Sequence, residues 1–209
     1  MGLSHKALQD KRSKMAAKRK AAAKNKQRPV ATQGSAGEWG RTAMAPIHEV
    51  LVPDALFELG IGTLTFSREL PDARIAVVGF LVDVFCLGVK NAFFTITPLA
   101  KYNEQRTHLE RIGKSSVQHP AYARKLVEAA VAYAHDLGFD PHPDYKVARL
   151  IFGDVDATAC PAHFEFGHEG KPFYCCGPKD TPNIQRRILT QLERRCGAKG
   201  FDYLLNIPS

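Results

Sequence analysis

GTLTFSRELPDARIAVVGFLVDVFCL, residues 62–87, is the stretch that decides the fold of this chain. Residues 62–70 alternate apolar and polar side chains, which is typical of a β-strand with one buried face. Residues 73–87 are almost continuously β-branched or aromatic, which predicts a buried strand. The short turn around Pro71 should join the two strands as an antiparallel hairpin. Gly79, inside the second strand, predicts a bulge or a close approach of another group.

The pattern continues outward from this hairpin. NAFFTIT (91–97) predicts a third strand. The clearest helix spans residues 120–137, because Pro120 suits the first helical position and Gly138 suits the position just after the end. Three further helices are expected at 99–111, directly after Pro98, at 143–152 and, with Thr181 as N-cap, at 182–196.

Two more strand features are expected near the C-terminus. Residues 163–176 should form a hairpin that turns at 167–170, and residues 201–205 should form a closing strand. The order of strands and helices predicts an α+β fold, in which a mostly antiparallel sheet packs with three to four helices.

Positive charge divides the chain into regions. Residues 1–28 hold ten Lys or Arg and one acid, a net charge of +9, whereas the remainder holds 19 bases and 20 acids, a net charge of −1. We therefore predict a basic arm over 1–28, a Gly/Ala/Pro-rich linker over 29–46 and a globular domain over 47–209. The arm should be largely disordered when free and helical once its charge is neutralised. Trp39 is expected to anchor the linker to the domain.

The composition of the arm suits contact with a polyanion. Bases set against phosphates release condensed counterions, so such an arm binds nucleic acid without a fold of its own. The alternatives are a solubility tail, a nuclear address or an anionic membrane surface, although the arm lacks the apolar face of an interfacial helix. The predicted nucleic-acid-binding residues are Lys6, Lys11, Arg12, Lys14, Lys18, Arg19, Lys20, Lys24, Lys26 and Arg28.

Other sequence features bear on location. No stretch approaches the ~20 apolar residues of a membrane span, and the N-terminus has no apolar core of a secretory signal, so no membrane partner is expected. Five cysteines without such a signal favour reduced thiols and a cytoplasmic location.

A group of Cys and His residues is the candidate metal site. Cys160 and His163 have the Cys-x-x-His spacing of half a zinc site, and the predicted hairpin could bring Cys175 near them. No second Cys-x-x-Cys pair is present, and buried thiols beside surface histidines are the simpler interpretation. No cofactor is predicted, with zinc as the one that this pattern leaves open.

Catalytic hypotheses centre on the end of the second strand. Asp83 could serve as a metal-binding carboxylate, and Cys86 could serve as a nucleophile with a histidine. Alternation along a strand places the two side chains on opposite faces. The simpler interpretation is that Asp83 caps or pairs at the sheet edge and that Cys86 is a small core residue.

Three stretches carry a resemblance to a known family. They are IAVVGFLVDVFCLGVKNAFF (75–94), AYAHDLGFDPHPDYKVARLIFG (132–153) and FEFGHEGKPFYCCGP (164–178). Here the chain resembles a family of uncharacterised bacterial proteins with a Lys/Arg-rich start and one compact domain. The resemblance implies a bacterial, cytoplasmic protein and no known activity.

These observations predict a nucleic-acid-associated, non-enzymatic protein. RNA, and the ribosome in particular, is favoured over DNA because long basic extensions suit the crowded phosphates of folded RNA, and no helix-turn-helix signature is present. One alternative is a metal- or Cys/His-dependent hydrolase or nuclease acting on nucleic acid. The other is a protein–protein interaction module.

Overall fold

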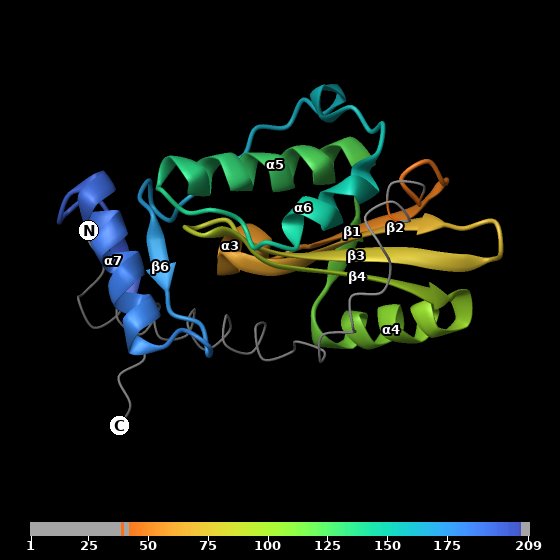
Figure 1. The fold of residues 1–209 in the computed structure, drawn as a ribbon, viewed down its shortest axis with the longest axis horizontal. Coiled ribbons are helices and arrows are strands. Elements are labelled where there is room, and N and C mark those ends of the chain that lie inside the picture. The colour runs from red at the N-terminus through yellow and green to blue at the C-terminus, as the bar shows by residue number, and fades with distance from the viewer. Residues whose placement is uncertain (1–38, 40–41, 206–209) are drawn as a thin grey trace, which may run out of the picture.

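The computed structural model describes Trp39 and residues 42–205, and it has the predicted α+β fold (Figure 1). A five-stranded antiparallel sheet carries helices on both faces, and a second sheet of two strands lies beside it. The strands are β1 (Ile47–Pro53), β2 (Ile61–Glu69), β3 (Arg74–Asp83), β4 (Gly88–Pro98), β5 (Ser115–Val117), β6 (Phe173–Cys175) and β7 (Asp202–Leu204). The helices are α3 (Leu56–Leu59), α4 (Leu99–Ile112), α5 (Pro120–Asp136), α6 (Tyr145–Ala148) and α7 (Pro182–Cys196), with 3₁₀ turns at Arg149–Phe152 and Ala157–Ala159.

The predicted hairpin is the centre of the large sheet. The strand order is β4-β3-β2-β1-β5, and β2 pairs with β3 in register from Ile61 opposite Asp83 to Glu69 opposite Ile75. The third predicted strand is part of β4. Strands β1 and β5 were not predicted, because neither stretch shows a long alternating pattern.

Alternation along the strands divides the core between two faces. Side chains such as Leu64, Phe66 and Phe80 are fully buried beneath α5 and α6. The opposite face carries Ile75 and Val77, which pack against Tyr102 of α4. Figure 1 shows α5 above the sheet and α4 below one end of it. The continuous apolar run in β3 is therefore explained, since both of its faces are covered.

Gly79 marks a close approach, as one of the two predictions for it required. It lies opposite Phe93 of β4, and a Cβ at this position would be 2.1 Å from the ring atom Cζ of Phe93. The bulge lies elsewhere, between Leu81 and Val82. The aromatic ring thus fills the space that the missing side chain leaves.

Helix α5 matches its prediction closely. It begins at Pro120 and ends at Asp136, and Gly138 follows with a φ of +87°. The cap was not predicted: Nδ1 of His119 accepts a hydrogen bond from the backbone N–H of Ala121. The predicted helix over 143–152 is instead one turn of α-helix, α6, followed by a 3₁₀ turn that stops at Gly153.

The predicted hairpin over 163–176 was wrong in its pairing. A tight turn is present, since His168 and Lys171 form an isolated antiparallel bridge. Beyond this turn, however, β6 pairs in parallel with β7, so its partner comes from the C-terminal end of the domain. A parallel partner so far along the chain leaves no local pattern in the sequence.

The described part of the predicted linker packs on the domain. Trp39 is fully buried and meets Phe94 edge-on, with ring centroids 5.1 Å apart, as the anchoring prediction required. Thr42 and Ala43 are buried too. The basic arm, residues 1–28, lies outside the described residues.

Candidate nucleic-acid interface

Helix α7 forms one end of the molecule, at the left of Figure 1. Its boundaries follow from local sequence: the hydroxyl of Thr181 accepts a hydrogen bond from the backbone N–H of Ile184 at 3.4 Å, and Pro182 takes the first helical position. Gly197, with a φ of +75°, follows the last residue. The predicted caps are confirmed at both ends.

One side of α7 attaches the helix to the domain. Leu192 is fully buried, and Ile188, Leu189 and Cys196 pack beside it against a small apolar cluster. The buried members of that cluster are Cys86, Leu87, Leu137, Tyr174, Cys176 and Leu192. This second apolar cluster is separate from the main core, so α7 is attached to the domain through the small cluster and not through the main core.

The rest of α7 presents arginines to solvent. Arg186, Arg187, Arg194 and Arg195 are all exposed, and Glu193 is the one acid in the helix. Arg187 and Arg194 are seven residues apart, which places them on the same side two turns from each other. The last-turn pair, Arg194 and Arg195, also suits the negative end of the helix dipole, but Arg186 and Arg187 lie too far from that end to gain from it.

Charge is segregated within the folded domain. Residues 171–205 hold seven bases and three acids, a net charge of +4, whereas residues 29–170 hold twelve bases and seventeen acids, a net charge of −5. The near-neutral net charge of residues 29–209 therefore conceals a basic region at the C-terminal end of the domain. A count over the whole body missed this end, whereas a count in windows along the chain finds it.

Polar contacts fix the position of α7. The Asp180 carboxylate accepts hydrogen bonds from the Tyr174 hydroxyl at 2.9 Å and from the Gly177 N–H at 2.6 Å. The same oxygen lies 3.6 Å from Nζ of Lys90 on β4. Burial, with the nearby Asp180, raises the pKa of Tyr174, so its hydroxyl remains a donor. Further along, Nε2 of Gln191 donates to the carbonyl of Leu137 at 2.8 Å. The arginines are thus carried by an anchored helix.

A guanidinium on such a helix suits phosphate. Its planar fork of donors matches phosphate oxygens, and it is always charged at neutral pH. Contacts of this kind position a nucleic acid but do not read its bases.

No family model, curated protein or solved structure matches the chain. The resemblance to an uncharacterised bacterial family therefore gains no support from these comparisons. No helix among the described residues is long and apolar enough to cross a membrane.

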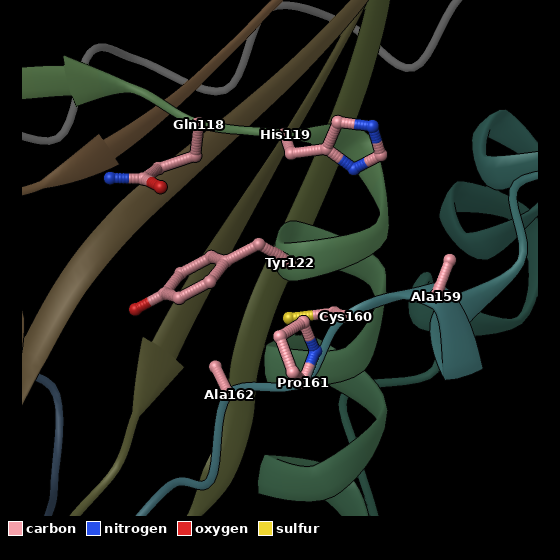
Figure 2. A pocket seen from close by; sticks show the side chains of 7 residues that line it. All are labelled: Gln118, His119, Tyr122, Ala159, Cys160, Pro161 and Ala162. Atoms are coloured by element: carbon pink, nitrogen blue, oxygen red, sulfur yellow. The ribbon is translucent and has the colours of Figure 1, made fainter.

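The candidate zinc ligands are not assembled. Cys160 and Cys175 are buried, His163 is exposed, and no group of three or more His, Cys, Asp or Glu side chains in the described part of the chain is placed to hold a metal. The parallel pairing of β6 explains this, because the expected hairpin that would have carried Cys175 toward Cys160 does not form. Cys160 instead lies in the wall of a pocket at the start of α5 (Figure 2).

Asp83 is committed to the backbone. Its carboxylate is fully buried, and Oδ1 accepts hydrogen bonds from the N–H groups of Phe85 and Cys86, both at 3.0 Å. This caps the turn that ends β3. Cys86 is fully buried in the small apolar cluster beside α7. These positions match the simpler structural interpretation of both residues.

A buried arginine was not singled out from the sequence. Arg68 is 3% exposed and donates to three backbone carbonyls: those of Ala45, Ile151 and Phe152. Burial lowers its pKa. The signal was present in the alternating pattern, since Arg68 shares the inward phase of Leu64 and Phe66. A charged residue at an inward-facing position of a strand indicates a buried side chain that forms hydrogen bonds inside the domain.

Proposed function

We propose that this protein binds RNA through the arginines of α7 together with the basic arm, without performing chemistry on it. The observation that carries the proposal is the exposed set Arg186, Arg187, Arg194 and Arg195 on a helix anchored to a domain that is otherwise acidic. An acidic body repels phosphate, so it would direct a polyanion toward the basic end. The arm adds ten further bases in the sequence.

RNA is favoured over DNA for two reasons. Long basic extensions suit the closely spaced phosphates of folded RNA, as in the ribosome. Sequence-specific DNA binding would need a recognition helix that enters the major groove with side chains for base edges, and α7 offers mainly phosphate-binding arginines. The proposal places the protein in the cytoplasm of a bacterium, a reducing compartment in which its five cysteines would remain thiols.

The experiment is a salt titration of RNA binding. Fluorescence anisotropy with a labelled single-stranded RNA would give the affinity of the full-length chain between about 50 and 200 mM salt. The test variant is Arg186→Gln/Arg187→Gln. The matched control is Lys101→Gln/Arg111→Gln, which removes the same charge from exposed positions on α4.

Each phosphate contact contributes about 0.7 to the slope of log affinity against log salt for a single strand. The α7 variant should therefore lower the slope by about 1.4, and the α4 control should leave it unchanged. Deletion of residues 1–28 should lower the slope further. Equal effects of the two double variants would show that net charge alone acts, and an unchanged slope after both the α7 substitution and the deletion would refute the proposal.

A further inference from the structure

A pocket of about 410 Å³ opens where the chain leaves β5 and enters α5. Its far wall is the segment that follows the second 3₁₀ turn, so residues about forty positions apart meet there (Figure 2). The volume falls within the range of small-molecule sites. The pocket is lined by Gln118, His119, Tyr122, Ala159, Cys160, Pro161 and Ala162.

The walls of this pocket are held by contacts outside it. The ring of Tyr122 meets Phe164 edge-on at 5.1 Å, and Phe164 in turn stacks on Phe57 with an interplanar angle of 8°. The opposite wall is tied to α5, because Nζ of Lys125 donates to the carbonyl of Cys160 at 2.6 Å. The pocket is therefore largely pre-formed, which lowers the entropic cost of binding.

Two polar groups in the pocket have hydrogen-bonding capacity to spare. Figure 2 shows the side chains of Gln118 and Tyr122 extending in the same direction, whereas His119 turns the other way. Neither the Gln118 amide nor the Tyr122 hydroxyl bonds to another residue in the described part of the chain. Burial, with a contribution from Cys160, raises the pKa of Tyr122, so its hydroxyl stays protonated and can donate. Gln118 can both donate and accept.

The lining excludes most charged ligands. It contains no carboxylate, lysine or arginine, and its one imidazole, that of His119, turns away from Gln118 and Tyr122, so a phosphate or carboxylate group beside those two residues would find no ion-pair partner. The remaining chemistry is the aromatic side chain of Tyr122, small apolar side chains and a donor–acceptor pair. A flat, uncharged heterocycle with both donors and acceptors on its edge matches all three.

We propose that this pocket takes an unpaired nucleobase, which stacks on Tyr122 and is read along its edge by Gln118. Recognition of unpaired RNA bases typically combines aromatic stacking with hydrogen bonds to the base edge. The inference rests on the proposed RNA-binding function, to which it adds a base-reading site separate from the phosphate-binding helix.

The test uses ribonucleosides, because they carry a base but no phosphate. Adenosine, guanosine, cytidine and uridine would each be titrated into the ¹⁵N-labelled full-length chain, with amide shifts around residues 117–123 and 159–163 as the readout. The variants are Gln118→Ala, which removes the amide, and Tyr122→Leu, which keeps an apolar side chain and removes the aromatic ring. Gln105→Ala, on α4, is the matched control.

At least one nucleoside should bind saturably, with an affinity that does not change between about 50 and 200 mM salt because no counterion is released. Gln118→Ala should weaken that affinity about tenfold, the change that corresponds to 1.4 kcal/mol, while Gln105→Ala leaves it unchanged. Absence of saturable shifts with all four nucleosides, or shifts that neither pocket variant alters, overturns the inference.

The source of the base is separated by the RNA titration. Gln118→Ala should weaken RNA binding and leave the salt slope unchanged. The α7 variant, in contrast, should lower the salt slope. If Gln118→Ala weakens nucleoside binding alone, the pocket serves free nucleosides and its role in reading RNA is overturned. If nucleosides bind but the α7 and arm changes leave RNA binding intact, the pocket stands and the proposed phosphate interface fails.

Discussion

Arg68→Met tests whether the buried guanidinium holds two segments onto the sheet. Arg68 lies on β2 and reaches the carbonyl of Ala45 before β1 and those of Ile151 and Phe152 in the first 3₁₀ turn. Methionine preserves an unbranched apolar stem of similar length but offers no donor. The substitution therefore isolates the hydrogen bonds from the packing.

The loss of stability expected for Arg68→Met depends on which of the three carbonyls are left without any hydrogen-bond donor. Phe152 keeps a second donor, the N–H of Val155 at 3.1 Å, so its carbonyl remains bonded. The carbonyls of Ala45 and Ile151 lose the donors that Arg68 provides. An unsatisfied buried acceptor such as the Ile151 carbonyl costs about 1–3 kcal/mol. The Ala45 carbonyl is only partly buried, so water can replace part of its lost bond and it adds less than this. Lysine in place of Arg68 should recover part of this loss, because one ammonium cannot span all three acceptors.

Urea denaturation followed by circular dichroism would measure the free energy of unfolding at constant m-value. The control is Arg74→Met, since Arg74 and its partner Asp72 are both about half exposed and such surface pairs contribute little to stability. A loss below about 1 kcal/mol for Arg68→Met, equal to that of the control, would show that water replaces the guanidinium and that the clamp has no net stabilising effect.

Two further predictions concern the core. Gly79→Val should lower the free energy of unfolding by about 1–3 kcal/mol, because a side chain there meets the Phe93 ring; in a urea double-mutant cycle with Phe93→Ala the loss should shrink, and simple additivity would contradict the contact. Burial raises the pKa of Tyr102, Tyr133 and Tyr174 above their ordinary value of 10.0, so unfolded tyrosines ionise first. The stabilisation that these buried hydroxyls provide should therefore be fully present below about pH 10 and should be lost as the pH rises further. Thermal melts as a function of pH should show a shallower loss for Tyr102→Phe than for the unchanged protein. If the two pH profiles run parallel, Tyr102 does not contribute to this loss.

Much of the fold was predictable because its signals are local. The alternation in residues 62–70 and the apolar run after it predicted the β2–β3 hairpin, and Pro and Gly residues marked both ends of α5 and α7. The cap of α5 escaped prediction because histidine is an uncommon capping residue. The split of the predicted 143–152 helix likewise depends on how that segment meets the sheet, which its own residues do not encode in a readable pattern.

The sequence by itself determined the sheet's central hairpin, the helix ends and the strong positive charge of the first 28 residues, since each depends on neighbours along the chain. Only the tertiary structure decided that β6 pairs with β7, that Arg68 donates to three distant carbonyls and that Cys160 and Tyr122 line one pocket. That the α7 arginines are exposed was also visible only in the tertiary structure, because packing against the small apolar cluster determines which side of the helix is buried. Contacts between residues far apart in the chain leave no periodic trace, and these contacts form both candidate binding surfaces.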